Sequence, residues 1–149
     1  MIYIASDHAG FELKKQLMDY LKSKGQEVED VGAFTLDSKD DYPDFILPCA
    51  QKVAVNPDLH WGIVIGASGQ GEAIAANKVK GIRAALFYGK NFDIIKLARL
   101  HNNANILSLG ARFVSLEDAT KAVDLWLSTA FEGDRHLKRI EKISKFENS

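Results

Sequence analysis

A carboxylate stands inside a glycine-rich loop near the middle of the chain. Residues 66–78 read GASGQGEAIAANK, so Gly66, Gly69 and Gly71 come shortly before Glu72. The apolar residues in front of the loop suit a strand, and the alanine-rich residues behind it suit a helix. A helix start of this kind holds an anion, or an oxygen that gains negative charge. Glu72 is interpreted as a general base, which the helix dipole keeps ionised while partial burial raises its proton affinity.

Two familiar nucleotide-binding motifs do not fit this loop. A Walker A loop has a lysine where Glu72 stands, and a carboxylate there would repel a triphosphate. A dinucleotide fingerprint needs GxGxxG after the first strand, and SDHAGF at residues 6–11 lacks that pattern. A structural explanation also stays open, in which the glycines permit a tight turn and Glu72 is a solvated charge in the first helical turn.

Asp7 and His8 form a second polar cluster, directly after the first predicted strand, and His101 and Asn102 form a third, at the end of a predicted helix. Carboxylates and imidazoles are side chains that take part in proton transfer. Each pair also has a structural explanation, because an aspartate often caps a helix start and a histidine followed by asparagines often ends a helix. The local sequence leaves both explanations open.

Arg135, His136 and Arg139 form a basic stretch in the last predicted helix. The two arginines are four residues apart and share one helix face, a spacing that can clamp a phosphate with paired donors. A solvated basic face is the alternative explanation. The single cysteine, Cys49, excludes an internal disulfide and a multi-cysteine metal site, and it is interpreted as a small core residue.

Five short apolar segments alternate with amphipathic ones along the chain. Most of these segments are continuous apolar runs, which are typical of strands buried on both faces of a parallel sheet. The sequence therefore predicts an α/β fold, a three-layer α/β/α sandwich of the Rossmann-like kind with a five-stranded parallel sheet. Strands are expected at residues 2–5, 28–31, 63–65, 81–87 and 104–109, and helices at 11–24, 43–55, 73–78, 91–100, 116–129 and 135–146.

Ligands of such sheets lie outside the carboxyl ends of the strands. We therefore expect the pair Asp7 and His8, the loop with Glu72, and the pair His101 and Asn102 to converge at one edge of the sheet.

The totals are those of an ordinary globular protein. The chain has 149 residues, 46% of them hydrophobic and 26% charged, which fits a single domain over residues 1–149. The net charge of −1 gives no overall field that favours nucleic acid or an anionic membrane. No apolar run approaches the roughly 20 residues of a membrane span. The apolar segment at the beginning of the sequence is too short for the core of a signal peptide. A cytoplasmic protein is expected.

Taken together, these motifs resemble the ribose-5-phosphate isomerase B and galactose-6-phosphate isomerase family. The resemblance covers essentially the whole chain. In one branch of that family a cysteine at the end of the third strand is the base, but here this position is Gly66. The sequence is similar to the other branch, in which a glutamate at the position of Glu72 is the base. The matching segments, in order, are SDHAGFELK, DYPDF, GASGQGEAIAANK, GIRAAL, ARLHNNANILSLGAR and GDRHLKRIEKI.

The resemblance implies interconversion of D-ribose 5-phosphate and D-ribulose 5-phosphate through a cis-enediol or enediolate. Glu72 would move the proton between C2 and C1, while His101 and Asp7 would open the sugar ring. The N–H groups of residues 68–71 would stabilise the oxyanion with help from Ser68 and Asn102. The substrate-binding residues it implies are His8, Tyr42, Gly66, Gly69, Gly71, Arg112, Arg135 and Arg139.

The resemblance also implies no metal or organic cofactor, because the reaction needs only a base and oxyanion stabilisation. It implies a homodimer or homotetramer with active sites shared across the interface, so that the last helix would dock on a partner subunit. Two alternatives stay open. One is isomerisation of another sugar phosphate (allose or galactose 6-phosphate, or a four-carbon phosphate), and the other is a sugar-phosphate-binding domain without catalysis.

Overall fold

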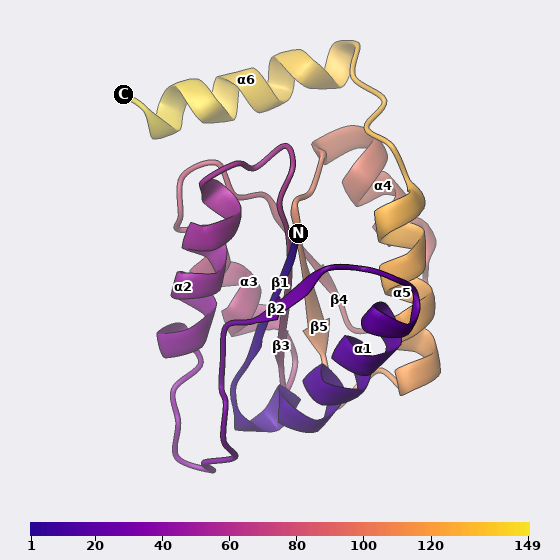
Figure 1. Ribbon diagram of the computed structural model, residues 1–149. Coiled ribbons are helices and arrows are strands. Elements are labelled where there is room, and N and C mark those ends of the chain that lie inside the picture. Colours follow the sequence, from indigo (N-terminus) through magenta and orange to yellow (C-terminus); the bar gives the residue numbers. More distant parts are fainter.

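Five parallel strands form a sheet that is covered by helices on both faces, as Figure 1 shows for the computed structural model, which describes all 149 residues. The strand order is β2-β1-β3-β5-β4. This confirms the predicted three-layer α/β/α fold. The strands are β1 (Ile2–Ser6), β2 (Val28–Asp30), β3 (Trp61–Gly66), β4 (Ala84–Phe87) and β5 (Ile106–Gly110). The helices are α1 (Phe11–Ser23), which follows the short 3-10 turn η1 (His8–Gly10), α2 (Pro43–Ala54), α3 (Gln70–Ala76), α4 (Asp93–Asn102), α5 (Leu116–Ser128) and α6 (Arg135–Glu147).

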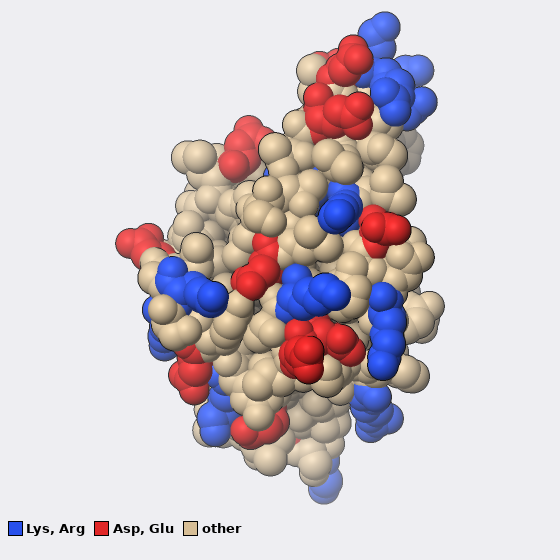
Figure 2. All heavy atoms as spheres, turned by 90° about the vertical axis from the view of Figure 1, so that its right-hand side faces the viewer, with Lys and Arg blue, Asp and Glu red and all other residues tan.

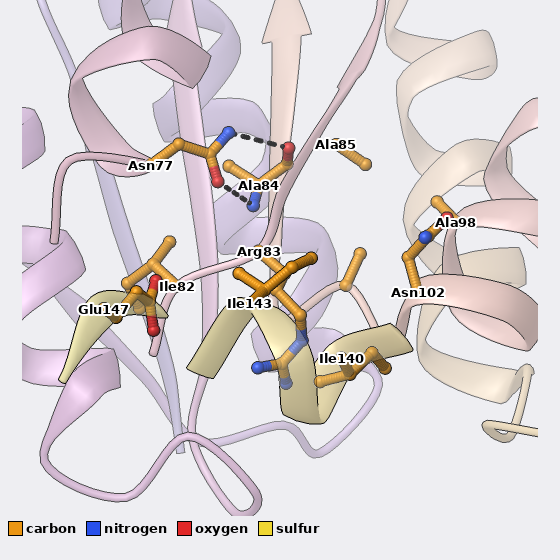
Figure 3. A pocket seen from close by; sticks show the side chains of 11 residues that line it. Asn77, Ile82, Arg83, Ala84, Ala85, Ala98, Asn102, Ile140, Ile143 and Glu147 are labelled. Carbon is orange, nitrogen blue, oxygen red and sulfur yellow. Dashed lines mark hydrogen bonds between the residues drawn. The ribbon is translucent and has the colours of Figure 1, made fainter. Parts of the chain in front are cut away.

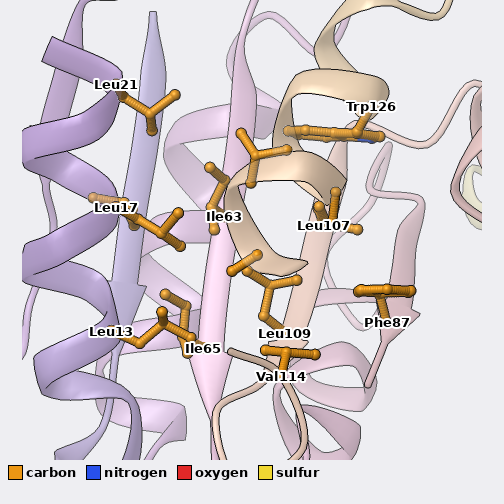
Figure 4. Packing of buried hydrophobic residues seen from close by; sticks show 14 of the residues in the cluster. Leu13, Leu17, Leu21, Ile63, Ile65, Phe87, Leu107, Leu109, Val114 and Trp126 are labelled. Carbon is orange, nitrogen blue, oxygen red and sulfur yellow. The ribbon is translucent and has the colours of Figure 1, made fainter. Parts of the chain in front are cut away.

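The central strand β3 is apolar on both faces because helices cover it on both sides. Ile63 and Ile65 point to one face and contribute to a cluster that includes Leu17 of α1 and Trp126 of α5 (Figure 4). Val64 points to the other face, where it joins the buried residues of α2 and α3. The continuous apolar run in the sequence is therefore a direct consequence of the three-layer arrangement.

Strands β4 and β5 start later than the sequence predicts, and one side chain explains both differences. The amide of Asn105 donates to the carbonyl of Gly81 at 2.8 Å, and its oxygen accepts from the backbone N–H of Arg83 at 2.8 Å. These hydrogen bonds replace the sheet ladder over residues 81–83, so that the first ladder partners are Ala84 and Ile106. The serine that precedes the predicted helix at 116–129 is of a residue type typical of an N-cap, and the structure confirms this role, since the Ser115 hydroxyl accepts from the N–H of Asp118 at 3.1 Å.

Helix α6 lies apart from both layers and crosses the end of the sheet at which the strands begin (Figure 1). Its first turn is buried at His136, and at its last turn the Glu147 carboxylate accepts from the N–H of Gly81 at 3.0 Å. Between these anchors a cleft of about 480 Å³ separates α6 from the starts of β4 and β5, lined in part by Arg83 and Ile143 (Figure 3).

The surface carries charges of both signs. On the face that includes α5, acidic and basic side chains are interspersed and do not gather into an extended patch of one sign (Figure 2). None of the helices combines the length and the apolar character that a membrane crossing requires.

The turn η1 packs so closely on β3 that only glycine fits at its end. A Cβ atom built on Gly10 would lie 2.5 Å from the carbonyl oxygen of Ile65 and 2.7 Å from its Cγ2. Because the obstacle includes backbone, we expect Gly10→Ala to lower the free energy of unfolding by about 1–3 kcal/mol in urea denaturation. Gly89→Ala is the matched control, since a Cβ there meets nothing within 4 Å. Equal unfolding free energies for the two variants would show that η1 can move away from β3.

Candidate active site

The loops that follow β1, β3 and β5 meet at the carboxyl edge of the sheet. Ser6 at the end of β1 pairs with Ile65, and Gly66 at the end of β3 pairs with Gly110 at the end of β5. The register therefore brings Asp7 and His8, the glycine loop and Arg112 to one edge. The loops are also joined directly, since the N–H of Arg112 donates to the carbonyl of Ala67 at 3.0 Å.

Glu72 is a buried carboxylate in the first turn of α3, with only 4% of its surface exposed. Its carboxylate lies against the Cα of Gly66, in the space where a side chain at that position would stand. Burial raises the pKa of Glu72 above its usual value, the negative charge of Asp7 raises it further, and a backbone hydrogen bond opposes both effects. The alternative of a solvated surface charge is therefore wrong.

The conformation of the glycine loop depends on Gly69. Its φ of +76° lies in the left-handed region, and a Cβ there would lie 2.8 Å from the side chain of Leu86. The carbonyl of Gly69 accepts a 2.6 Å hydrogen bond from the hydroxyl of Ser108, which pins the loop to β5. The Ser68 hydroxyl accepts from the N–H of Gln70 at 3.3 Å. The structural role of the glycines is therefore real, and it accompanies the placement of Glu72.

Tyr42 reaches this loop from the start of α2. A Cβ on Gly71 would meet the Tyr42 ring at 2.8 Å and its hydroxyl oxygen at 3.0 Å, so the phenol end lies directly over the loop. The structure thus brings Tyr42, Gly66, Ser68, Gly69, Gly71 and Glu72 together, as predicted.

Asp7 caps η1, which confirms the structural explanation of this residue. Its carboxylate accepts from the N–H of Ala9 at 2.9 Å and from that of Gly10 at 3.3 Å. It is nevertheless buried and close enough to act electrostatically on Glu72. The two roles are compatible, because the capping contacts use the oxygen Oδ1.

His8 has a partner that the sequence did not indicate. Its Nδ1 lies 2.6 Å from Oδ1 of Asp40, and its backbone N–H donates to the same oxygen at 3.0 Å. The hydrogen bond that His8 donates to Asp40 is the main cause of a raised pKa of His8, the charge of Asp7 adds to it, and burial and Arg112 oppose it. Asp40 lies in a polar loop, 32 residues from His8, and no sequence pattern signals the contact.

His101 and Asn102 lie at the opposite edge of the sheet, so the expectation that they converge with Glu72 in one chain is wrong. They end α4, which runs antiparallel to the strands and therefore finishes where β5 begins. Asn102 lines the cleft under α6, together with Ala84 (Figure 3). A five-residue strand at about 3.3 Å per residue puts roughly 15 Å between the two edges.

The basic residues are divided between the same two edges. Arg112 lies near His8. Arg135 and Arg139 belong to α6, whose first turn packs against His101 at the end of α4. The His101 ring stacks on that of His136 with a centroid distance of 4.2 Å. Burial lowers the pKa of His136, the positive charges of His101, Arg135 and Arg139 lower it further, and Glu132 opposes them.

Two groups of side chains have donor atoms within 4.8 Å of one another: His101, Glu132 and His136, and Asp7, His8 and Asp40. In the first group the guanidinium of Arg139 donates to Nδ1 of His136 at 3.1 Å, which leaves the proton of the neutral ring on Nε2. In the second, Oδ1 of Asp7 and Oδ1 of Asp40 accept hydrogen bonds within the chain. The carboxylates of the second group are thus engaged in hydrogen bonds within the chain, whereas Nε2 of His136 in the first group is buried without a hydrogen-bond partner.

The fold and the site place the chain among α/β/α proteins that bind a ligand at the carboxyl edge of a parallel sheet. A family model described as Ribose/Galactose Isomerase matches residues 2–143. The probable ribose-5-phosphate isomerase B of Mycoplasma genitalium is 47% identical over 146 residues, which cover 98% of this chain and 95% of that protein. The chain therefore belongs to the ribose/galactose isomerase family.

Solved structures agree with this assignment. The crystal structure of ribose-5-phosphate isomerase B from Mycoplasma genitalium with bound ribulose-5-phosphate has a TM-score of 0.95 at 47% identity, covering 99% of this chain and 96% of that chain. Ribose-5-phosphate isomerase B from Clostridium thermocellum has a TM-score of 0.91 at 46% identity, covering 99% and 97%.

Cys49 lies in the core, as predicted. It is fully buried in α2, and burial raises the pKa of its thiol to about 12. Because the thiolate is the reactive form, we expect iodoacetamide to leave the native protein unmodified by mass spectrometry over hours at pH 7.5. The denatured chain is the control and should be alkylated fully. Rapid alkylation of the native protein would mean that α2 opens readily.

Proposed function

We propose that this protein is an aldose–ketose isomerase that interconverts D-ribose 5-phosphate and D-ribulose 5-phosphate. The observation that carries the proposal is the buried carboxylate of Glu72, in a glycine loop at the edge of the sheet where ligands bind. Its relatives are named ribose-5-phosphate isomerase B, and one of their structures holds ribulose-5-phosphate. A domain that only binds a sugar phosphate has no need of a buried carboxylate, which would repel the ligand.

In this proposal Glu72 removes the proton from C2 of the open-chain aldose, and the C2–H electron pair forms the C1–C2 double bond of the enediolate. In the enediolate the oxygen on C1 carries the negative charge. The proton of the C2 hydroxyl then passes to that oxygen, Glu72 delivers its proton to C1, and the C2–O bond becomes the carbonyl of the ketose. The raised pKa of Glu72 favours this exchange, because a base works best when its pKa approaches the operating pH. No metal or organic cofactor takes part in the proposal.

The N–H groups of residues 68–71, with Ser68, stabilise the enediolate oxygen in this mechanism. Such donors contribute about 3–4 kcal/mol each in other enzymes. Gly66, Gly69 and Gly71 allow the loop to adopt its path, and Tyr42 contacts the substrate beside Gly71. Asp7 and His101 open the sugar ring, and Asn102 assists at the oxyanion.

A homodimer with shared sites resolves the separation of these residues. His101 and Asn102 stand at one edge of the sheet and Glu72 at the other, so a second copy must supply the first pair. The exposed apolar side chains of Ile74, Ile94 and Leu97, together with the open edge of β4, support such a contact. A homotetramer built from two such dimers has the same sites. A cytoplasmic location stays a prediction from the sequence.

The substrate phosphate is bound from both copies. His8 and Arg112 come from the chain that supplies Glu72, and Arg135 and Arg139 come from α6 of the second copy. Charge-assisted hydrogen bonds from guanidinium groups suit a phosphate dianion. Helix α6 docks on the partner in this arrangement, which accounts for its exposed apolar residues Leu137, Ile143 and Phe146.

Replacing Glu72 by glutamine tests the base. We expect Glu72→Gln to lower kcat on ribose 5-phosphate by about 100- to 10,000-fold, with KM largely unchanged, since the amide keeps the shape but accepts no proton. In the wild type, kcat should fall as the pH drops through the raised pKa of Glu72. The residual activity of the variant should not show this dependence on pH.

The assay uses a panel of four-, five- and six-carbon aldose phosphates. Full activity of Glu72→Gln would refute the base assignment. Binding of ribose 5-phosphate by the wild type without turnover of any sugar on the panel would favour a binding domain. Greater turnover of a four- or six-carbon sugar would change the substrate assignment.

Subunit complementation tests the shared site. Co-expression of Glu72→Gln and His101→Asn, each nearly inactive alone, should restore roughly a quarter of wild-type activity, because half the dimers are mixed and each mixed dimer has one intact site. Co-expression of Glu72→Gln and Asp7→Asn is the control, since both residues lie at the same edge and no intact site forms. Absence of activity in the first mixture, with mixed dimers shown by mass spectrometry, would place His101 in the site of its own chain.

A further inference from the structure

Asp40 contacts His8 in a way that would control the charge of the imidazole. Only 9% of the Asp40 side chain is exposed, against 34% of that of His8. One carboxylate oxygen accepts from both Nδ1 and the backbone N–H of His8, and the other, Oδ2, is buried without a hydrogen-bond partner. His8 is the only cationic partner of Asp40, so the buried negative charge is balanced by the imidazolium form of that residue.

The loop that carries Asp40 is anchored to the core. The fully buried amine of Lys14 donates to Oδ1 of Asp30 at 2.7 Å and to the carbonyl of Ala33 at 2.6 Å. The N–H of Ala33 donates to the carbonyl of Ser6 at 2.7 Å, and the N–H of Asp40 to that of Asp37 at 3.1 Å. These contacts fix the start of the loop and close a turn at its end, and the Asp40 carboxylate that follows this turn contacts His8.

We propose that Asp40 is a positioning residue that holds His8 as an imidazolium with its Nε2–H presented to the substrate phosphate. The proposal rests on the proposed function, in which His8 binds that phosphate. With Nδ1 committed to Asp40, Nε2 is the nitrogen left for the ligand. A charged donor makes a shorter and stronger hydrogen bond to a phosphate than a neutral one does.

Three charged groups act on His8, and two of them favour the imidazolium. Asp40 and Asp7 raise the pKa of His8 above its ordinary value of 6.5, while burial and the positive charge of Arg112 lower it. The net result is a raised pKa, so at a given pH a larger fraction of His8 is protonated than of an isolated histidine. Without the charge of Asp40, the Arg112 guanidinium would favour the neutral ring.

Asp40→Asn separates the charge from the position, because the amide oxygen can still accept both hydrogen bonds. Compared with the wild type at the same pH, we expect the KM for ribose 5-phosphate to be similar near pH 5.5 and about three- to tenfold higher near pH 8, with kcat within about twofold. Comparison at equal pH cancels the titration of the phosphate itself. Glu12→Gln is the control, since Glu12 is an exposed carboxylate at the start of α1 that does not act on the pKa of His8.

The second measurement does not depend on turnover. Nuclear magnetic resonance titration of histidine-labelled protein, with His8→Gln to assign the signal, should show a lower pKa for His8 in Asp40→Asn and no change in Glu12→Gln. Inorganic phosphate should shift the His8 signal at pH 7.5 in the wild type, and less in Asp40→Asn.

The outcomes separate the two proposals. If the wild type does not isomerise ribose 5-phosphate, the proposed function fails, and the His8 titration alone decides whether Asp40 controls the charge. If the wild type is active but Asp40→Asn keeps the wild-type KM at every pH, or keeps the wild-type pKa of His8, the positioning role of Asp40 is overturned.

Discussion

The carboxylate of Glu72 occupies a space that exists only because residue 66 has no side chain. Glu72 enters this space from the first turn of α3, and Gly69 and Ser108 hold the loop between strand and helix in place. Removal of the carboxylate from water raises its pKa, so the packing that fixes the position of Glu72 also raises its proton affinity. A side chain at the end of β3 and a carboxylate at position 72 compete for one volume. The proposed role of Glu72 therefore requires a residue without a side chain at position 66.

The parallel sheet explains why one chain brings together only some of the residues in the proposed site. Loops that follow strands gather at the carboxyl edge, whereas helices that return to the next strand end at the other edge. His101 and Asn102 end such a helix and are joined there by the basic start of α6. The two edges carry complementary halves of the proposed chemistry, with the base and the loop on one and the ring-opening histidine and two arginines on the other. The proposed dimer follows from this division, because two copies related by a twofold axis can bring unlike edges together twice.

Much of the fold was predictable because it depends on local patterns. Continuous apolar runs identified the parallel strands, and Ser115 identified the start of α5 by its capping hydroxyl. The starts of β4 and β5 were not predictable, because the Asn105 side chain replaces ladder hydrogen bonds with partners 22 and 24 residues away. The glycine loop and Glu72 were found from spacing alone. Asp40 was missed, because its contact with His8 depends on how a polar loop folds back to the residues that follow β1.

The sequence by itself determined the three-layer fold, the family and the identity of the candidate base, because these depend on periodicity, on residue type and on motifs at fixed spacing. The tertiary structure alone decided that Glu72 is buried beside Gly66, that Asp40 contacts His8, and that His101 faces away from Glu72. The burial of a side chain, its hydrogen-bond partner and the edge of the sheet at which it lies depend on segments that are distant in the sequence and meet only in the folded chain. The pKa of a carboxyl or an imidazole depends on its burial and its partners.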